Sequence, residues 1–236
     1  MSQPVPLARP LYKQLLDVKS IFFYLLVLAF VFSAVLIFAF WLDGWTLWLL
    51  GLLILAAWTP FVFSTMRAIY QHQPWFAFLY LLVIAQFAHM LEHLSQMVEL
   101  HMLGWVGPKA SGIIGFLNTE WVHLLWNSWV LLAAALLLCA YKRNVWLWIL
   151  FLFAIYHEVE HLYIVSIYVR TGIAGNPGLL AQGGLIGGGL PIKRPDLHAI
   201  YAVLEEATLL MIYFGERRKL RLAEMQPVGA VQLSTG

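Results

Sequence analysis

Two stretches of the chain share the pattern His-x-x-Glu-His-Leu, at residues 89–94 and 157–162. In each stretch two imidazoles stand four residues apart, so on a helix they share one face and can hold one metal ion. The carboxylate between them can bind metal, orient a ring or move a proton. Both stretches lie inside apolar runs, 75–103 and 145–169, that are long enough to cross a bilayer. Ionisable residues at membrane depth are costly, so the pattern predicts a functional site.

The hydrophobic run that follows each stretch opens with an acidic residue and then a histidine. Glu120 and His123 open the first of these runs, and Asp196 and His198 open the second. The repeat is weak in the rest of the chain, but it predicts two matching half-sites. The candidate metal ligands on these four runs are His89, Glu92, His93, Glu120, His123, His157, Glu160, His161, His198 and Glu205.

These donors outnumber the ligands of a single ion, since zinc usually takes four and non-haem iron up to six. The excess and the repeat together favour two transition-metal ions. A donor set of nitrogen and oxygen suits iron, zinc, copper or manganese, and a single cysteine, Cys139, excludes a thiolate cluster. Iron is favoured, because the Glu-x-x-His spacing of di-iron four-helix bundles occurs at residues 120–123 and 158–161.

Three residues are expected to take part in catalysis: Glu158, Tyr201 and Glu205. Glu158 directly follows His157 and could bind metal, activate water or transfer a proton. Tyr201 and Glu205 would share one face of a helix with His198.

Six apolar segments must position these residues. The 236-residue chain is 62% hydrophobic and only 11% charged, whereas soluble domains carry about 25% charged residues. We therefore expect an all-α, polytopic integral membrane protein in which spans three to six form a four-helix, metal-bearing bundle. The expected spans are residues 20–42, 45–66, 75–103, 118–140, 145–169 and 196–214.

These spans are expected to form one transmembrane domain. Its expected parts are a cytoplasmic segment 1–19, two scaffold spans within 20–66, the site-bearing bundle 75–214 with a glycine-rich outer loop 171–195, and a cytoplasmic tail 215–236.

The distribution of positive charge predicts the orientation. An even number of spans places both termini on one side, and ten of the 14 lysines and arginines fall on that side. By the positive-inside rule both termini are then cytoplasmic. The ionisable residues come late in the third and fifth spans and early in the fourth and sixth. All four sets therefore lie in the outer half of the membrane.

Three classes of function fit such a site. The first is an oxidoreductase or oxygenase with a di-metal centre, acting on a quinol or another hydrophobic substrate that enters from the lipid bilayer. The second is an intramembrane zinc hydrolase, with His157 and His161 as zinc ligands and Glu158 as general base. The third is a metal-ion carrier or sensor.

Other classes fit less well. A haem b protein needs only two axial histidines, so the many carboxylates count against it. A polar bundle without metal would have to pair every buried imidazole by hydrogen bonds alone. The chain has no glycine-rich phosphate loop and no clustered basic and aromatic surface, so nucleotides and nucleic acids are not expected partners.

The histidine clusters at 89–93 and 157–161 resemble those of the integral-membrane desaturase and hydroxylase group. The likeness covers only the local histidine spacings. It implies a non-haem metal centre that oxidises a hydrophobic substrate. That group carries its histidines on the cytoplasmic side, whereas the spans here predict an outer position.

Overall fold

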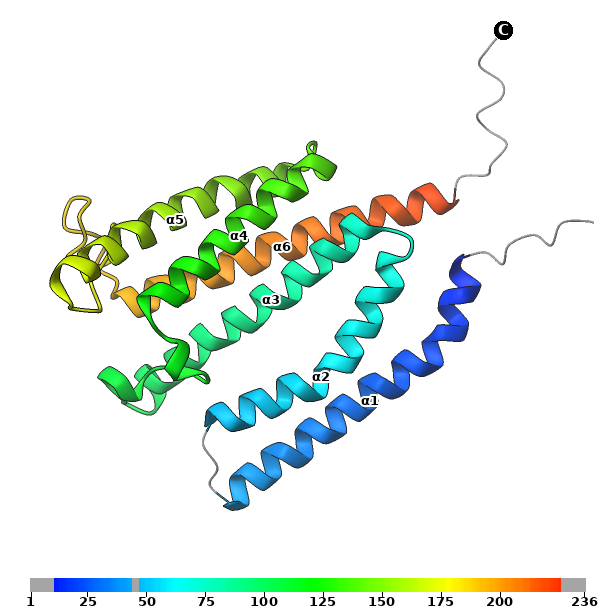
Figure 1. The fold of residues 1–236 in the computed structure, drawn as a ribbon, viewed down its shortest axis with the longest axis horizontal. Helices are drawn as coiled ribbons and strands as arrows, with labels where there is room; N and C mark the ends of the chain where they lie inside the picture. The colour runs from blue at the N-terminus through cyan, green and yellow to red at the C-terminus, as the bar shows by residue number, and fades with distance from the viewer. Residues whose placement is uncertain (1–10, 44–46, 226–236) are drawn as a thin grey trace, which may run out of the picture. The chain divides into compact units, whose positions relative to one another are not determined.

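The structure, a computed structural model, describes residues 11–43 and 47–225, which form six long helices (Figure 1). No β-strand occurs within these two ranges. A π-helical turn, Val98–Met102, continues α3. The helices are α1 Leu11–Asp43, α2 Leu47–Tyr70, α3 Pro74–Met97, α4 Glu120–Tyr141, α5 Val145–Thr171 and α6 Arg194–Met225.

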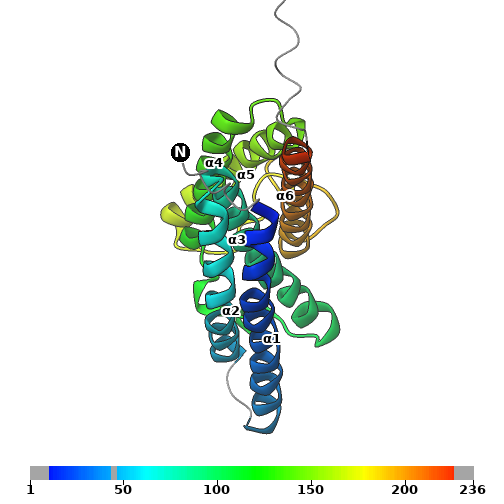
Figure 2. The same cartoon turned by 90° about the vertical axis from the view of Figure 1, so that its right-hand side faces the viewer.

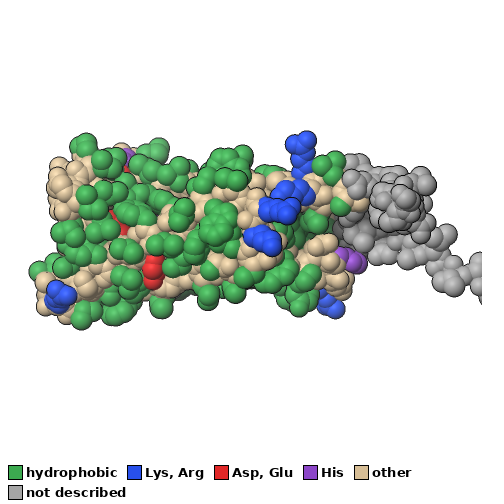
Figure 3. Space-filling view, turned by 90° about the horizontal axis from the view of Figure 1, so that it is seen from above, with side chains coloured by type: hydrophobic (Ala, Val, Ile, Leu, Met, Phe, Trp, Pro, Cys, Tyr) green, Lys and Arg blue, Asp and Glu red, His purple; other side chains and the backbone are tan. Residues whose placement is uncertain are grey.

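All six helices are long and apolar enough to cross a membrane, so the predicted all-α, polytopic fold is confirmed. Figure 3 shows hydrophobic side chains over most of one face of the molecule. Helices α1 and α6 run furthest beyond their predicted spans, since α1 begins at Leu11 and α6 continues to Met225. Hydropathy marks only the part of a helix that hydrocarbon surrounds, whereas polar ends can remain helical outside that layer.

The chain divides into two compact units between His72 and Gln73. In the first unit α1 and α2 form a hairpin and lie side by side in both views (Figures 1 and 2). The indole N–H of Trp58 donates a hydrogen bond to the hydroxyl of Ser33 across the hairpin, at 3.1 Å. Helix α2 continues through Pro60 and bends along its length in Figure 1. Proline lacks an N–H and crowds the preceding turn, so a bend is expected there.

The second unit is a four-helix bundle of α3, α4, α5 and α6. Helices α3 and α5 each pack against both α4 and α6, which closes the bundle into a ring. In Figure 1, α3 and α5 end where α4 and α6 begin. The connecting segments 103–119 and 172–193 lie at this end, which we call the loop end. Residues late in α3 and α5 therefore meet residues early in α4 and α6.

Side-chain caps and a glycine fix where these helices start and stop. Thr119 caps α4 by accepting a hydrogen bond from the N–H of Val122, at 3.3 Å. The spacing predicts a cap at residue 118 or 119, and the structure selects 119. Asn144 caps α5 in the same way through the N–H of Leu147. Gly172, with a φ of 70°, ends α5 in the left-handed conformation that glycine adopts readily.

Candidate metal centre

The six histidines predicted as metal ligands converge near the loop end of the bundle, between all four helices. Each imidazole lies near at least two others. Ring centroids are separated by 4.6 Å for His89 and His93 and by up to 6.2 Å elsewhere. His123 of α4 stacks on His161 of α5, with ring planes 9° apart. One cluster therefore links both pairs of helices.

The cluster has two halves that follow the sequence repeat. Each half takes two histidines from a His-x-x-Glu-His stretch and one from the start of the next helix. The α3–α4 half-site is His89, His93 and His123. The α5–α6 half-site is His157, His161 and His198.

The α5–α6 half-site has the geometry of a metal site. Its three side chains each bring one ring nitrogen within 4.8 Å of the other two. The Nε2 atoms of His161 and His198 are 3.2 Å apart. Two nitrogens that bind one ion at about 2.0–2.1 Å in a tetrahedral site stand roughly 3.3 Å apart. These three buried side chains could therefore hold a metal ion.

The other ring nitrogen of two of these histidines is held by an oxygen. His157 Nδ1 lies 2.9 Å from Glu205 Oε1, and His198 Nδ1 lies 3.0 Å from the main-chain oxygen of Arg194. An Nδ1 beside an acceptor carries the hydrogen, so Nε2 of the neutral ring keeps its lone pair. Histidine ligands of metals are typically oriented this way. Buried Nε2 of His157 has no hydrogen-bond partner among the described residues, and a metal ion would supply one.

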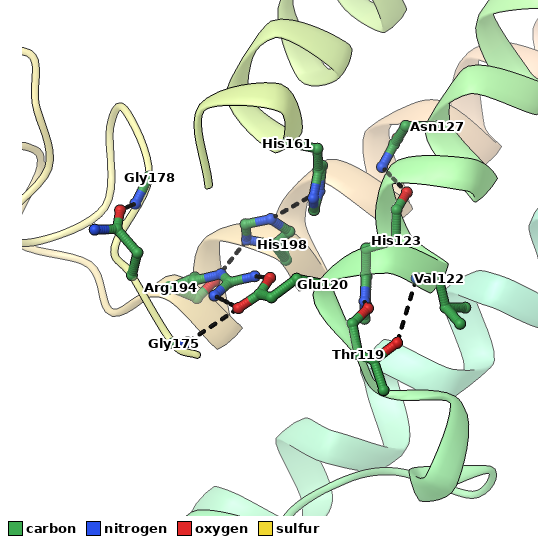
Figure 4. A network of polar contacts seen from close by, with 11 residues as sticks. Thr119, Glu120, Val122, His123, Asn127, His161, Gly175, Gly178, Arg194 and His198 are labelled. Carbon is green, nitrogen blue, oxygen red and sulfur yellow. Dashed lines mark hydrogen bonds and ion pairs between the residues drawn. The ribbon is translucent and has the colours of Figure 1, made fainter. Parts of the chain in front are cut away.

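The same arrangement occurs in the α3–α4 half-site. His93 Nδ1 lies 3.2 Å from the side-chain oxygen of Gln96. His123 Nδ1 lies 2.9 Å from the main-chain oxygen of Thr119, one helical turn earlier (Figure 4). Since His198 bonds Arg194 across the same four-residue interval, α4 and α6 orient their histidines alike. Both half-sites therefore present Nε2 lone pairs.

Glu160, a predicted ligand, holds the loop that follows α5. Its Oε1 accepts a hydrogen bond from the N–H of Leu179 at 2.9 Å. Gly178 has a φ of 79°, and a Cβ at this position would lie 2.7 Å from Oε1. Glycine therefore permits the loop backbone to approach the carboxylate.

Glu92, the corresponding residue of the first stretch, holds the loop that follows α3. Both of its oxygens accept from the N–H of Ile114, at 3.0 and 3.1 Å. Gly112, with a φ of 87°, lies so close that a Cβ would overlap Glu92 Oε1. The two stretches therefore use their residues alike. Their histidines join the cluster, and the glutamate before the second histidine bonds the backbone of the following loop.

Glu120 is paired with an arginine. The Arg194 guanidinium donates to both of its oxygens, at 2.8 and 2.5 Å, and the N–H of Gly175 donates to Oε1 at 3.0 Å (Figure 4). This contact joins the starts of α4 and α6 to the glycine-rich loop. The sequence gives no signal for this pair, because nothing local to residue 194 indicates its partner at residue 120.

A chain of side-chain contacts connects the two half-sites. The second oxygen of Glu205 accepts from Gln86 Nε2 at 2.5 Å, and Gln86 Oε1 accepts from the indole N–H of Trp126 at 2.9 Å. Trp126 in turn stacks on His89, with centroids 5.0 Å apart. Gln86 could be found from the sequence, since it precedes His89 by three residues on one helix face. Trp126 carries no such signal.

The two remaining catalytic candidates, Glu158 and Tyr201, lie in different places. Glu158 Oε1 accepts from the Ser128 hydroxyl at 2.7 Å, between α5 and α4. The Tyr201 ring lies 5.1 Å from His157, and its hydroxyl is 3.0 Å from that of Tyr156. Tyr201 therefore contacts the cluster itself.

The structure thus brings the six predicted histidines together. It also shows a protein partner for at least one oxygen of each predicted carboxylate ligand, whereas Oε2 of Glu160 has none among the described residues. Each of these carboxylates accepts hydrogen bonds from the protein. The donors are N–H groups of a loop, an arginine or other side chains of the bundle. The carboxylates are Glu92, Glu120, Glu160 and Glu205.

Comparison of the chain with protein-family models, with curated proteins and with solved structures gave no match. The site's chemistry therefore rests on its own geometry.

Proposed function

We propose that this protein is a membrane-embedded metalloenzyme that holds two transition-metal ions, one in each half-site, and oxidises a quinol or another hydrophobic substrate. The observation that carries the proposal is a buried imidazole nitrogen, His157 Nε2, which lies beside two further histidines and has no hydrogen-bond partner in the part of the chain that the structure describes. Polar groups at membrane depth need partners, and metal ions satisfy several imidazoles at once. A pair of redox-active ions would supply electron transfer and dioxygen activation.

Copper fits the donors best, with iron second. The oxygens of Glu92, Glu120 and Glu205 accept hydrogen bonds from protein groups, and the described side chains that lie close enough to share an ion are all histidines, which leaves neutral imidazoles as the principal donors. Imidazole suits copper, iron and zinc, whereas di-iron bundles use inward glutamates. A neutral donor set in an apolar medium also favours ions of low charge. Copper therefore ranks ahead of the iron that sequence spacing alone favours.

The protein's own residues have defined tasks in this proposal. Glu205 fixes the hydrogen of His157 on Nδ1 and so directs Nε2 toward the site. Tyr201 is the residue we assign to proton transfer at the substrate, since its ring centroid lies 5.1 Å from that of His157 and its hydroxyl lies 3.0 Å from that of Tyr156. Leu197 and Ala181 pack against Tyr201 and exclude water from this side.

Metal content per chain tests the proposal. The protein is purified in mild detergent without added metal and measured by mass spectrometry, alone and as the His157→Ala and His89→Ala variants. We expect two copper or iron ions per chain and a loss of at least one in either variant. Quinol-dependent oxygen consumption should then follow metal content.

Other results would point to the competing functions. One zinc that only His157→Ala removes would favour the hydrolase, and Glu158→Gln would then abolish activity without removing the zinc. Metal that crosses the membrane of reconstituted vesicles would favour a carrier. Protein that binds no metal under any condition would contradict the proposal.

A further inference from the structure

The two half-sites resemble each other in sequence but differ in their surroundings. All three histidines of the α5–α6 half-site are buried, and their nitrogens already lie within 4.8 Å of one another. Within the described parts of the chain, only these three histidines meet that distance criterion. In the α3–α4 half-site, His89 and His123 are partly exposed. The α5–α6 half-site is therefore the better preformed of the two.

A carboxylate adds to this difference. Glu205, which is 1% exposed, bonds His157 and is itself held by Gln86. The residue at the corresponding place in α4 is Val130, since Glu205 follows His198 by seven residues and Val130 follows His123 by seven. His89 stacks on Trp126 where His157 contacts a carboxylate.

We infer that the half-sites bind their ions unequally: the α5–α6 half-site fills first and tightly, and the α3–α4 half-site fills second and exchanges its ion. The physical reasons are preorganisation, which lowers the cost of assembling the ligands, and the negative charge of Glu205 beside the first ion. The inference rests on the proposed two-ion centre. It makes the α3–α4 ion the more accessible one, beside partly exposed His89 and His123.

Zinc(II) titration of the metal-free, full-length protein in detergent tests this inference. Zinc binds imidazole but takes no part in redox chemistry, so the measurement is independent of any oxidase activity. A chromophoric chelator that competes for zinc reports each affinity. We expect two separate steps in the wild type, the first of them tighter by at least tenfold.

Three variants assign the two steps. Glu205→Gln should weaken the first step by about 10–100-fold, as loss of a carboxylate behind a histidine ligand does elsewhere, and should leave the second step unchanged. His89→Ala should remove the second step alone. Glu216→Gln is the matched control, because Glu216 is a buried carboxylate on the same helix that bonds Asn144 away from the cluster. It should change neither step.

The outcomes separate this inference from the two-ion proposal. Two zinc ions of equal affinity, or a Glu205→Gln variant that weakens only the second step, would overturn the inference and leave the two-ion centre standing. A single zinc lost in His157→Ala but retained in His89→Ala would contradict the two-ion centre and, with it, the ordered filling of two half-sites, and would leave a one-ion site at α5–α6. A single zinc lost in both variants would contradict both.

Discussion

At the scale of single residues, several buried carboxylates of this protein have fixed protein partners. The pair of Glu120 and Arg194 is the strongest case, because the two groups meet through two parallel hydrogen bonds and both are largely buried. Such a pair contributes little net free energy compared with apolar residues, but removal of one partner leaves an uncompensated charge. The pair also fixes the starts of α4 and α6, which carry His123 and His198.

We therefore predict that Arg194→Met lowers the free energy of unfolding by about 3–5 kcal/mol, since Glu120 then remains buried without its counterion. The double variant Arg194→Met with Glu120→Leu should regain most of that loss, because no buried charge is left. Chemical denaturation in detergent measures both. A single variant as stable as the wild type would show that water reaches Glu120.

At the scale of helices and loops, the two halves of the bundle are built alike. Each His-x-x-Glu-His stretch ends near a loop that returns to its own glutamate, through Ile114 in one half and Leu179 in the other. A glycine of positive φ accompanies each contact. The two glutamates therefore hold the connecting segments against the loop end of the bundle, near the histidines.

The glycine-rich loop offers a matched pair of substitutions. Gly178→Ala and Gly187→Ala both place a side chain at positive φ, which costs roughly 1–2 kcal/mol in either position. Only the Cβ at position 178 meets Glu160, whereas a Cβ at position 187 has nothing within 4 Å. We predict that Gly178→Ala alone releases the loop, seen as faster amide hydrogen exchange at Leu179. Equal amide hydrogen exchange at Leu179 in both variants would show that Glu160 does not hold the loop.

At the scale of the whole molecule, the six apolar helices are consistent with an integral membrane protein. Length and hydropathy give the spans, whereas the direction in which they cross follows from charge. The positive-inside count predicts that both termini lie in the cytoplasm, and the candidate metal centre, near the loop end, would then face outward.

Cysteine labelling in intact cells tests this orientation. In a Cys139→Ser background, Ile186→Cys in the glycine-rich loop and Arg143→Cys in the turn after α4 each introduce one exposed thiol. A membrane-impermeant maleimide should label position 186 in intact cells and position 143 only after permeabilisation. The reverse labelling pattern would show that the loop end faces the cytoplasm and that the termini face outward.

The sequence by itself determined the six helices and the histidine cluster. Twenty or so consecutive apolar residues have few alternatives to a membrane helix. Histidines four residues apart share a helix face whatever surrounds them, so His89 with His93 and His157 with His161 could be paired without a structure. The capping of α4 at residue 118 or 119 followed from the same local rules.

Only the tertiary structure decided what each carboxylate does. Glu120 bonds Arg194, which is 74 residues away in the chain, and Glu205 bonds Gln86, which is 119 residues away. Such pairings depend on how helices pack and on where loops return, and neither is encoded in a short stretch of sequence. A glutamate beside a histidine can bind metal or an N–H group with equal chemical ease. The folded backbone brings the N–H groups to Glu92 and Glu160 and leaves the imidazoles to face one another.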